Sequence, residues 1–253
     1  GPIRLKEIAE ETAQKAKRLA TSLSKLGVEI VHEAYFDTIC LKVSDVEAVK
    51  KTAIAMNTNF WYHENGCITI TVDETTNEKS LNLILSIFAK ALNQEGVELT
   101  AARGEVAIPI HLQRSSEFLE HPIFNAFQSE TDMMRYIKQL ENKDISLTRS
   151  MIALGSCTMK LNAATELYPI SDPQFANLHP FVPVNQAKGY ETIIKELHDA
   201  LCEITGFHSM SFQPNSGAQG EYTGLMVIKA YHEANGNPNR KIVLIPSSAH
   251  GTN

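Results

Sequence analysis

The stretch FQPNSGAQGEYTGL, residues 212–225, joins a short apolar run to a segment with helical spacing. The apolar runs MSFQP (210–214) and KIVLIP (241–246) stand on either side of a helix predicted over residues 221–236. Strand, glycine-containing turn, helix and strand make one βαβ crossover, which predicts parallel strands. The sequence therefore indicates an α/β fold in this part of the chain.

The turn between the first of these strands and the helix consists of small residues, Ser216, Gly217, Ala218, Gln219 and Gly220. The start of a helix offers free N–H groups and the positive end of its dipole, which favour anions. Small side chains let an anion approach the backbone, and the serine adds a hydroxyl donor. The pattern is neither GxGxxG nor GxxxxGK[ST], so dinucleotide-binding and P-loop interpretations lack support. A tight turn whose glycines serve only geometry is the alternative.

His250 follows the second predicted strand, in the segment SSAHGTN. Because open α/β sheets bind ligands at the carboxyl ends of their strands, we expect His250 near the turn. A phosphate at the turn and an imidazole stacked on a ring suit a phosphorylated aromatic cofactor. A polar residue at a strand end, without a ligand, is the alternative.

The first ninety or so residues predict a compact α+β unit. A helical stripe of Leu5, Ile8, Ala16, Leu19, Leu23 and Leu26 runs over residues 4–26, with Thr12 in its one polar slot. The other expected elements are a strand over 38–43, a helix from Ser44 to about Ala55, a hairpin over 59–72 turning at Asn65-Gly66, and a helix over 80–94. Ser44 and Glu47 have the spacing of a capping box.

The chain has 253 residues and a formal net charge of −6, which argues against binding to nucleic acid or to an anionic membrane. Its four cysteines form no CxxC pair, as expected for reduced thiols in a cytosol-like compartment. The spacing of His121 and His179 fits no metal motif, so no metal is expected. The start at Gly1-Pro2 without Met, and an end just after a predicted strand, suggest part of a longer protein.

Several long and distinctive motifs follow one another in the second half of the chain: SMIALGSCTMKLN (150–162), NLHPFVP (177–183), ELHDALCEITGF (196–207), FQPNSGAQGEY (212–222) and IPSSAHGTN (245–253). Together they resemble one known family, the P-proteins of the glycine cleavage system, which are glycine decarboxylases dependent on pyridoxal 5'-phosphate. Residues 118–147 also follow the family pattern, so the resemblance is dense over about residues 115–253.

The resemblance implies two tandem fold-type-I halves, similar to an aminotransferase dimer fused end to end, with this chain spanning their join. Residues 1–95 would be the small domain that ends the first half, 96–162 a connecting arm, and 163–253 the start of the cofactor-binding large domain with its parallel sheet.

The resemblance also implies which residues lie near the cofactor. Those expected to bind it are Ser216, Gly217, Ala218 and Gln219 at the phosphate, His250 on the ring, and Thr252 and Asn253 beside them. Ser156, Cys157, Thr158 and Lys160 are expected on the substrate side. Lys160 lacks the neighbours of the family's Schiff-base lysine, and Cys157 lacks a base, so neither is assigned a catalytic role. The Schiff-base lysine, in a His-Lys-Thr motif, is expected beyond Asn253, so the chain alone is predicted to be inactive.

The implied reaction decarboxylates glycine and passes the aminomethyl group to the lipoyl group of the H-protein. A homo-oligomer, in the bacterial cytoplasm or the mitochondrial matrix, is implied as well. Two alternatives stay open: a non-catalytic assembly module, and another fold-type-I enzyme such as a cysteine desulfurase-like protein. A His-Lys-Thr segment after Asn253 in the parent gene would distinguish them.

Overall fold

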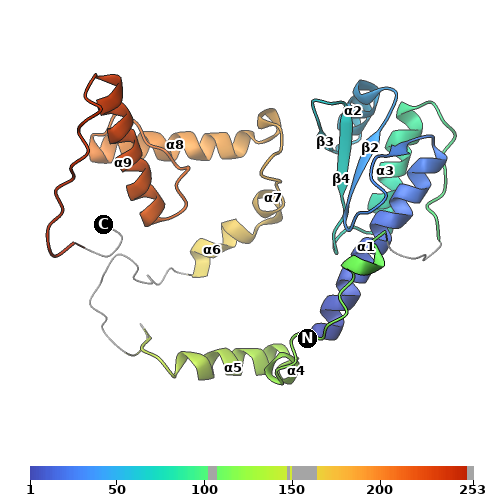
Figure 1. The fold of residues 1–253 in the computed structure, drawn as a ribbon, viewed down its shortest axis with the longest axis horizontal. Helices are drawn as coiled ribbons and strands as arrows, with labels where there is room; N and C mark the ends of the chain where they lie inside the picture. Colours follow the sequence, from blue (N-terminus) through green and yellow to red (C-terminus); the bar gives the residue numbers. More distant parts are fainter. Residues whose placement is uncertain (102–106, 147–148, 150–163, 250–253) are drawn as a thin grey trace. The chain divides into compact units, whose positions relative to one another are not determined.

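The structure, a computed structural model, describes residues 1–101, 107–146, 149 and 164–249. It divides into two compact units, Gly1–Lys138 and Gln139–Asn253. Figure 1 gives the labels of the helices and strands in both units.

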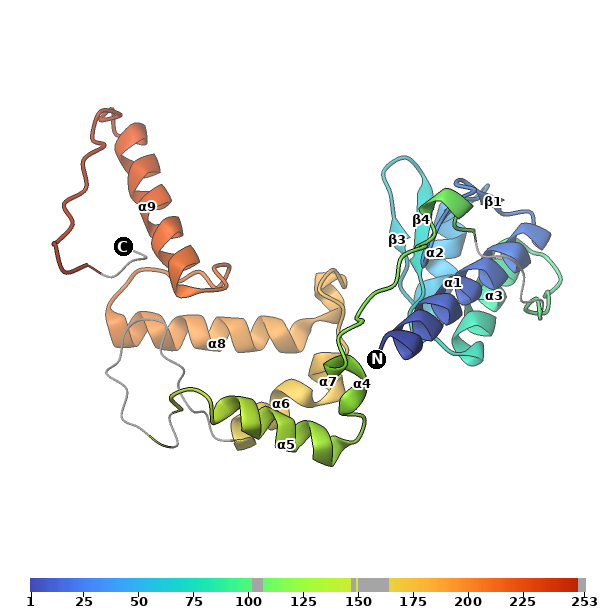
Figure 2. The ribbon, with the colours of Figure 1, turned by 60° about the horizontal axis from the view of Figure 1, so that its bottom comes forward.

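The first unit combines a four-stranded antiparallel sheet with several helices, of which α1, α2 and α3 contribute to its core (Figures 1 and 2). Its elements are α1 (Pro2–Lys25), β1 (Glu29–Ile30), β2 (Thr38–Lys42), α2 (Val46–Ala55), β3 (Trp61–Tyr62), β4 (Cys67–Thr71), α3 (Glu78–Ala91), η1 (Ile110–Leu112), α4 (Ile123–Ala126) and α5 (Glu130–Glu141), the last of which runs into the second unit. The strand order is β1-β2-β4-β3, and every neighbouring pair is antiparallel.

One face of this sheet is buried. Ile39, Leu41, Ile68 and Ile70 point into the core, whereas the residues that alternate with them are partly or fully exposed. Period-two burial means that helices cover one face only. Helix α3 contacts both α1 and α2, so the three helices form a single layer. The predicted order of helix, strand, helix, hairpin and helix is confirmed.

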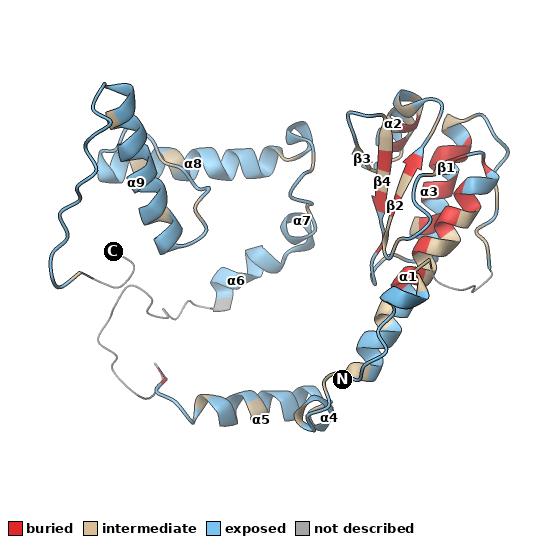
Figure 3. Cartoon of the chain, in the orientation of Figure 1, coloured by how far each residue is buried: buried red, intermediate tan, exposed pale blue. Residues whose placement is uncertain are grey.

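The apolar stripe of α1 enters the core from its second half. Ala16, Leu19, Leu23 and Leu26 are buried and pack with Phe88 of α3. Leu5 is 51% exposed, because the first turns of the helix extend beyond the sheet (Figure 3). The predicted stripe is therefore right for the carboxyl-terminal half of the helix, whereas Leu5 near its start remains exposed.

Local turn chemistry sets the element boundaries. Gly66 has φ +79° in the turn between β3 and β4, a conformation that glycine adopts without strain, and this confirms the predicted hairpin. Helix α2 is capped by Asp45, whose Oδ1 accepts a hydrogen bond from the backbone N–H of Ala48 at 2.9 Å. The cap is one residue later than the predicted Ser44, because the Asp45 backbone is extended as an N-cap requires.

Beyond α3 the chain returns to α1 and is held at Thr100. Arg18 donates from Nε to the Thr100 carbonyl at 2.7 Å, and Lys25 donates to its hydroxyl at 3.1 Å. Ser22 bonds the same hydroxyl at 3.0 Å and accepts from the Thr100 N–H at 2.9 Å. We call these four hydrogen bonds the Thr100 clasp. Arg18 also forms a two-pronged ion pair with Glu78, the shorter arm being 2.6 Å.

The second unit contains helices and connecting segments. Its elements are α6 (Ala164–Ser171), α7 (Pro173–Ala176), η2 (Val184–Gln186), α8 (Lys188–Thr205) and α9 (Gly217–Ala234). The helix predicted over residues 221–236 is confirmed as α9, which begins four residues earlier, at Gly217, so that the predicted turn forms its first turn. Helix α8 ends where Gly206 adopts the left-handed conformation, φ +72°, and donates its N–H to the carbonyl of Cys202.

The two runs predicted as strands beside α9 do not form strands here. Residues 210–213 and 241–246 have no ladder partner within the described ranges, and Ile242 and Leu244 are 91% and 92% exposed. A β-strand exists only when a neighbour accepts and donates its hydrogen bonds, so apolar sequence alone does not form one. The class is mixed α and β as predicted, but the sheet that is present is antiparallel and belongs to the first unit.

Across the described part of the chain, no helix combines the length and the apolar character needed to span a bilayer.

Candidate functional site

The turn before α9 is fixed by its own side chains. Ser216 is the N-cap, and its Oγ accepts from the backbone N–H of Gln219 at 3.2 Å. Gln219 reaches back, and its Oε1 accepts from the backbone N–H of Asn215 at 2.8 Å. This pairing resembles a capping box, except that the return bond comes from the residue before the N-cap, and it satisfies the N–H of Gln219, one of the donors that a helix start leaves free.

Two further donors of this turn remain available. Among the residues that the structure describes, the backbone N–H groups of Gly217 and Ala218 have no hydrogen-bond acceptor. A Cβ atom placed on Gly217 or Gly220 would meet no atom within 4 Å, so the space beside the backbone is open. Free amides beside open space, at the positive end of an 18-residue helix, fit the phosphate group of a cofactor.

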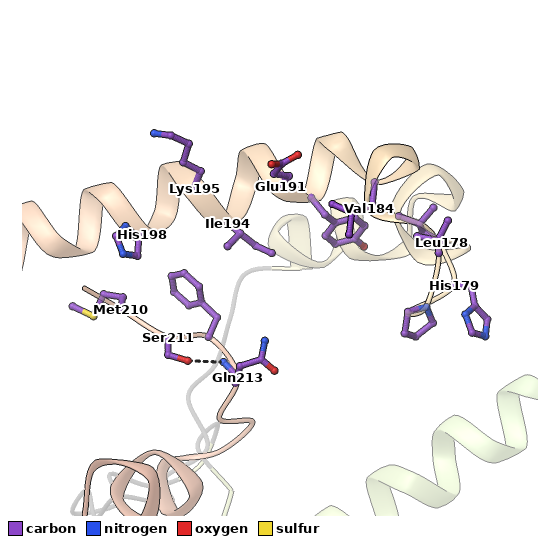
Figure 4. A pocket seen from close by; sticks show the side chains of 15 residues that line it. Leu178, His179, Val184, Glu191, Ile194, Lys195, His198, Met210, Ser211 and Gln213 are labelled. Carbon is purple, nitrogen blue, oxygen red and sulfur yellow. Dashed lines mark hydrogen bonds between the residues drawn. The ribbon is translucent and has the colours of Figure 1, made fainter. Parts of the chain in front are cut away.

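The residues that precede this turn in the sequence help to line a pocket of about 950 Å³ (Figure 4). Three segments line it: the NLHPFVP motif with the residues after it, one side of α8, and residues 210–213, which lead into the turn. The lining residues are Leu178, His179, Pro180, Val182, Val184, Ala187, Tyr190, Glu191, Ile194, Lys195, His198, Met210, Ser211, Phe212 and Gln213. Ile194 points toward residues 210–213, whereas Lys195 points away from them (Figure 4).

A polar cluster on α8 forms one end of the pocket. His198 Nδ1 is 3.1 Å from Asp199 Oδ1, and His198 Nε2 is 3.2 Å from Ser209 Oγ. Lys195 donates to Asp199 Oδ2 at 2.6 Å, and this hydrogen bond, with a further one from His198, lowers the pKa of Asp199. The same contact raises the pKa of Lys195. Cys202 lies one turn further along, with Sγ 3.8 Å from His198 Nε2.

Sequence reasoning located the turn and missed the α8 cluster. Ser216, Gly217, Ala218 and Gln219 come together as one helix start. The cluster has a sequence signal, His-Asp-x-x-Cys, whose first and last residues share one helix face because they are four apart.

The other predicted site residues fall outside the described residues. They are His250, Thr252 and Asn253 beside the turn, and Ser156, Cys157, Thr158 and Lys160 on the substrate side. Within the described ranges, no group of three or more His, Cys, Asp or Glu side chains is arranged to hold a metal ion.

Comparison with known proteins gives consistent matches along the chain. Residues 1–88 match the family model described as "Glycine cleavage system P-protein". The whole chain is 52% identical to "Glycine dehydrogenase (decarboxylating)" of Christiangramia forsetii, 49% identical to the protein of that name from Flavobacterium johnsoniae, and 48% identical to that from Shewanella oneidensis.

The chain spans 27% of the length of each of these curated relatives. The family model matches residues of the first unit, and about half of all residues along the whole chain are identical to those of the relatives. We conclude that this chain belongs to the glycine cleavage system P-protein family.

Proposed function

We propose that this chain is part of a pyridoxal-phosphate-dependent glycine decarboxylase and supplies the phosphate-binding turn of its cofactor site. The whole enzyme decarboxylates glycine and transfers the aminomethyl group to the lipoyl group of the H-protein. Support comes from the similarity of this whole chain to part of proteins named glycine dehydrogenase (decarboxylating). The bacterial source of these relatives favours the cytoplasm as its location, and a homo-oligomer as its state is part of the proposal.

The observation that carries the proposal is the pair of free N–H groups at Gly217 and Ala218 beside open space. These amides donate to the phosphate, and Ser216 donates its hydroxyl hydrogen while Oγ continues to accept from Gln219. The dianionic phosphate also gains from the helix dipole. The bound cofactor supplies an electron sink for the electrons left when CO2 departs.

The rest of the proposed arrangement concerns domains and neighbouring residues. Residues 1–95 end the first half, 96–162 form the arm, and 163–253 begin a fold-type-I large domain. His250 lies flat against the cofactor ring, with Thr252 and Asn253 beside it. Ser156, Cys157, Thr158 and Lys160 face the substrate.

The phosphate contact is testable on this chain alone by titration, following backbone amide resonances by NMR. We expect pyridoxal phosphate and inorganic phosphate to shift the Gly217 and Ala218 resonances, and pyridoxal without phosphate to leave them unchanged. Gly217→Pro removes one donor at a helix position that tolerates proline, and should weaken the response several-fold. Gly189→Pro, near the start of α8, is the matched control and should leave the response of the turn to phosphate unchanged.

If the Gly217 and Ala218 resonances respond neither to pyridoxal phosphate nor to inorganic phosphate, the proposed phosphate site is wrong. That outcome would favour the non-catalytic assembly module, for which the exposed apolar side chains of α8 and α9 are the supporting observation.

Activity is a separate measurement. The chain contains no His-Lys-Thr segment, so we expect no exchange of glycine with bicarbonate by the purified chain. Measurable exchange would show that the anchoring lysine is not where the family resemblance implies.

A further inference from the structure

Two cysteines lie on neighbouring strands of the antiparallel sheet. Cys40 of β2 is paired with Thr69 of β4, and Cys67 of β4 is paired with Lys42 of β2, so the two cysteines are diagonal neighbours. Because the residues that alternate with them point into the core, both thiols lie on the other face of the sheet. Both are free and only partly buried, so small molecules can reach them.

The two thiols act on each other directly. Burial raises the pKa of Cys40, and the charge of Cys67 and a hydrogen bond between the two side chains raise it further. A thiol is a weak hydrogen-bonding group, so this contact requires the two side chains to lean toward each other across the strands. The proposed cofactor site makes no use of this pair.

We propose that Cys40 and Cys67 form a reversible redox pair, in which oxidation joins β2 to β4 through a disulfide. The oxidant is a small disulfide of the glutathione class. One cysteine thiolate attacks it, forms a mixed disulfide and releases one small thiolate. The other cysteine then attacks the protein sulfur of the mixed disulfide and releases the second. The protein loses two electrons and two protons, and the small disulfide is reduced to two thiols.

The surroundings of the two sulfur atoms set the order of these steps. The thiolate is the nucleophile, and the raised pKa of Cys40 lowers the fraction of Cys40 that is in this form. We therefore expect Cys67 to attack the small disulfide and Cys40 to resolve the mixed disulfide.

The position of the pair makes the disulfide easy to reduce again. Diagonal neighbours have Cα atoms about 7–8 Å apart, and a disulfide spans about 4.4–6.8 Å, so closure needs a shift on the order of 1 Å. Cys67 is the first residue of β4 and follows the turn at Gly66, where the ladder ends and a shift disturbs few hydrogen bonds. A bond that draws the strands together is strained, and strained disulfides are the labile ones.

The test uses the whole chain, equilibrated without oxygen in buffers of increasing ratio of oxidised to reduced glutathione. Remaining thiols are alkylated, and mass spectrometry of peptides identifies the products. We expect a Cys40–Cys67 cross-link within one chain, with the loss of two hydrogen atoms, and its full reversal by dithiothreitol.

Single variants test the order of attack. Cys40→Ser should stop at a mixed disulfide of glutathione with Cys67, whereas Cys67→Ser should react with glutathione at Cys40 at least tenfold more slowly. Cys202→Ser is the matched control from the second unit and should form the cross-link as the parent chain does. Circular dichroism verifies that each variant is folded.

Three results would overturn the proposal: Cys40 and Cys67 that stay reduced while Cys202 is oxidised, a cross-link that forms only between two chains, or one that dithiothreitol does not reverse. None of them bears on phosphate binding at the turn, which the NMR titration reads separately.

Discussion

The first hundred residues and the α8–α9 region contain similar amphipathic sequences and pack very differently. In the first region, α1 and α3 place apolar side chains against Ile39, Leu41 and Ile68 of the sheet, and these side chains are fully buried. In the second, α8 and α9 contain no buried residue, and Leu197 is 48% exposed. An apolar stripe predicts a helix, but a core forms only where a second element is present to cover the stripe.

Leucine truncation should show the largest contrast between the regions. Leu19→Ala removes a side chain with no exposed surface and should lower the free energy of unfolding by about 2–5 kcal/mol. Leu197→Ala removes a half-exposed side chain and should cost less than about 1 kcal/mol. Trp61, the single tryptophan, reports urea unfolding of the first region by fluorescence, and circular dichroism reports α8. Equal losses for the two variants would mean that Leu197 is buried in solution.

A left-handed glycine in each region gives a second, smaller contrast. Gly66→Ala places a Cβ at φ +79° between paired strands, and should cost the first region about 1–2 kcal/mol. Gly206→Ala imposes a similar strain at the end of α8, where fraying of the last turn relieves it. We therefore expect the Trp61 transition to shift only for Gly66→Ala, with Gly206→Ala seen as faster amide exchange near Thr205. A Trp61 transition that moves equally in both variants would show that strain at Gly206 is not relieved within α8.

Acid titration should give the smallest effect. The hydrogen bond from Arg18 lowers the pKa of Glu78 below its usual 4.5, so folding favours the carboxylate. This stabilisation is present above the unfolded pKa and is lost as pH falls through the lower folded value. In the parent chain, the urea midpoint of the Trp61 transition should therefore fall as the pH drops below about 4.5. In Glu78→Gln this fall should be smaller.

The matched variant is Asp199→Asn, which removes a carboxylate whose pKa is also lowered but which lies on α8. It should leave the acid dependence of the Trp61 transition as in the parent chain. A Glu78→Gln variant with an unchanged decline would assign the acid sensitivity to other carboxylates.

Local signals in the sequence predicted most of the first region. Alternation at Ile39 and Leu41 gave β2 and its buried face, and Asn65-Gly66 gave the hairpin. Strand β1 was missed because two residues carry no periodicity. The runs at 210–214 and 241–246 look like strands locally, but pairing depends on partners distant in sequence, which no local pattern supplies.

The same limit applies to the candidate site. Small residues before a helix predicted the free amides of Gly217 and Ala218, since any helix start has them. The Gln219 side chain bonding to Asn215 depends on a rotamer that the sequence does not specify. Ser209 contacts His198 only because Gly206 turns the chain back after α8, so this contact, unlike the His-Asp-x-x-Cys spacing on α8, could be recognised only in three dimensions.

The Thr100 clasp determines where a stand-alone piece of this chain can be cut. A gene ended at Ala91 would encode every long helix and strand of the first region, yet Arg18, Ser22 and Lys25 would lose four hydrogen bonds. Val97 and Leu99, which pack on the core, would be lost as well. Such a shortened product should be less soluble and melt earlier than one carried through residue 101. The usable end of the domain is therefore set by an irregular segment rather than by the last helix.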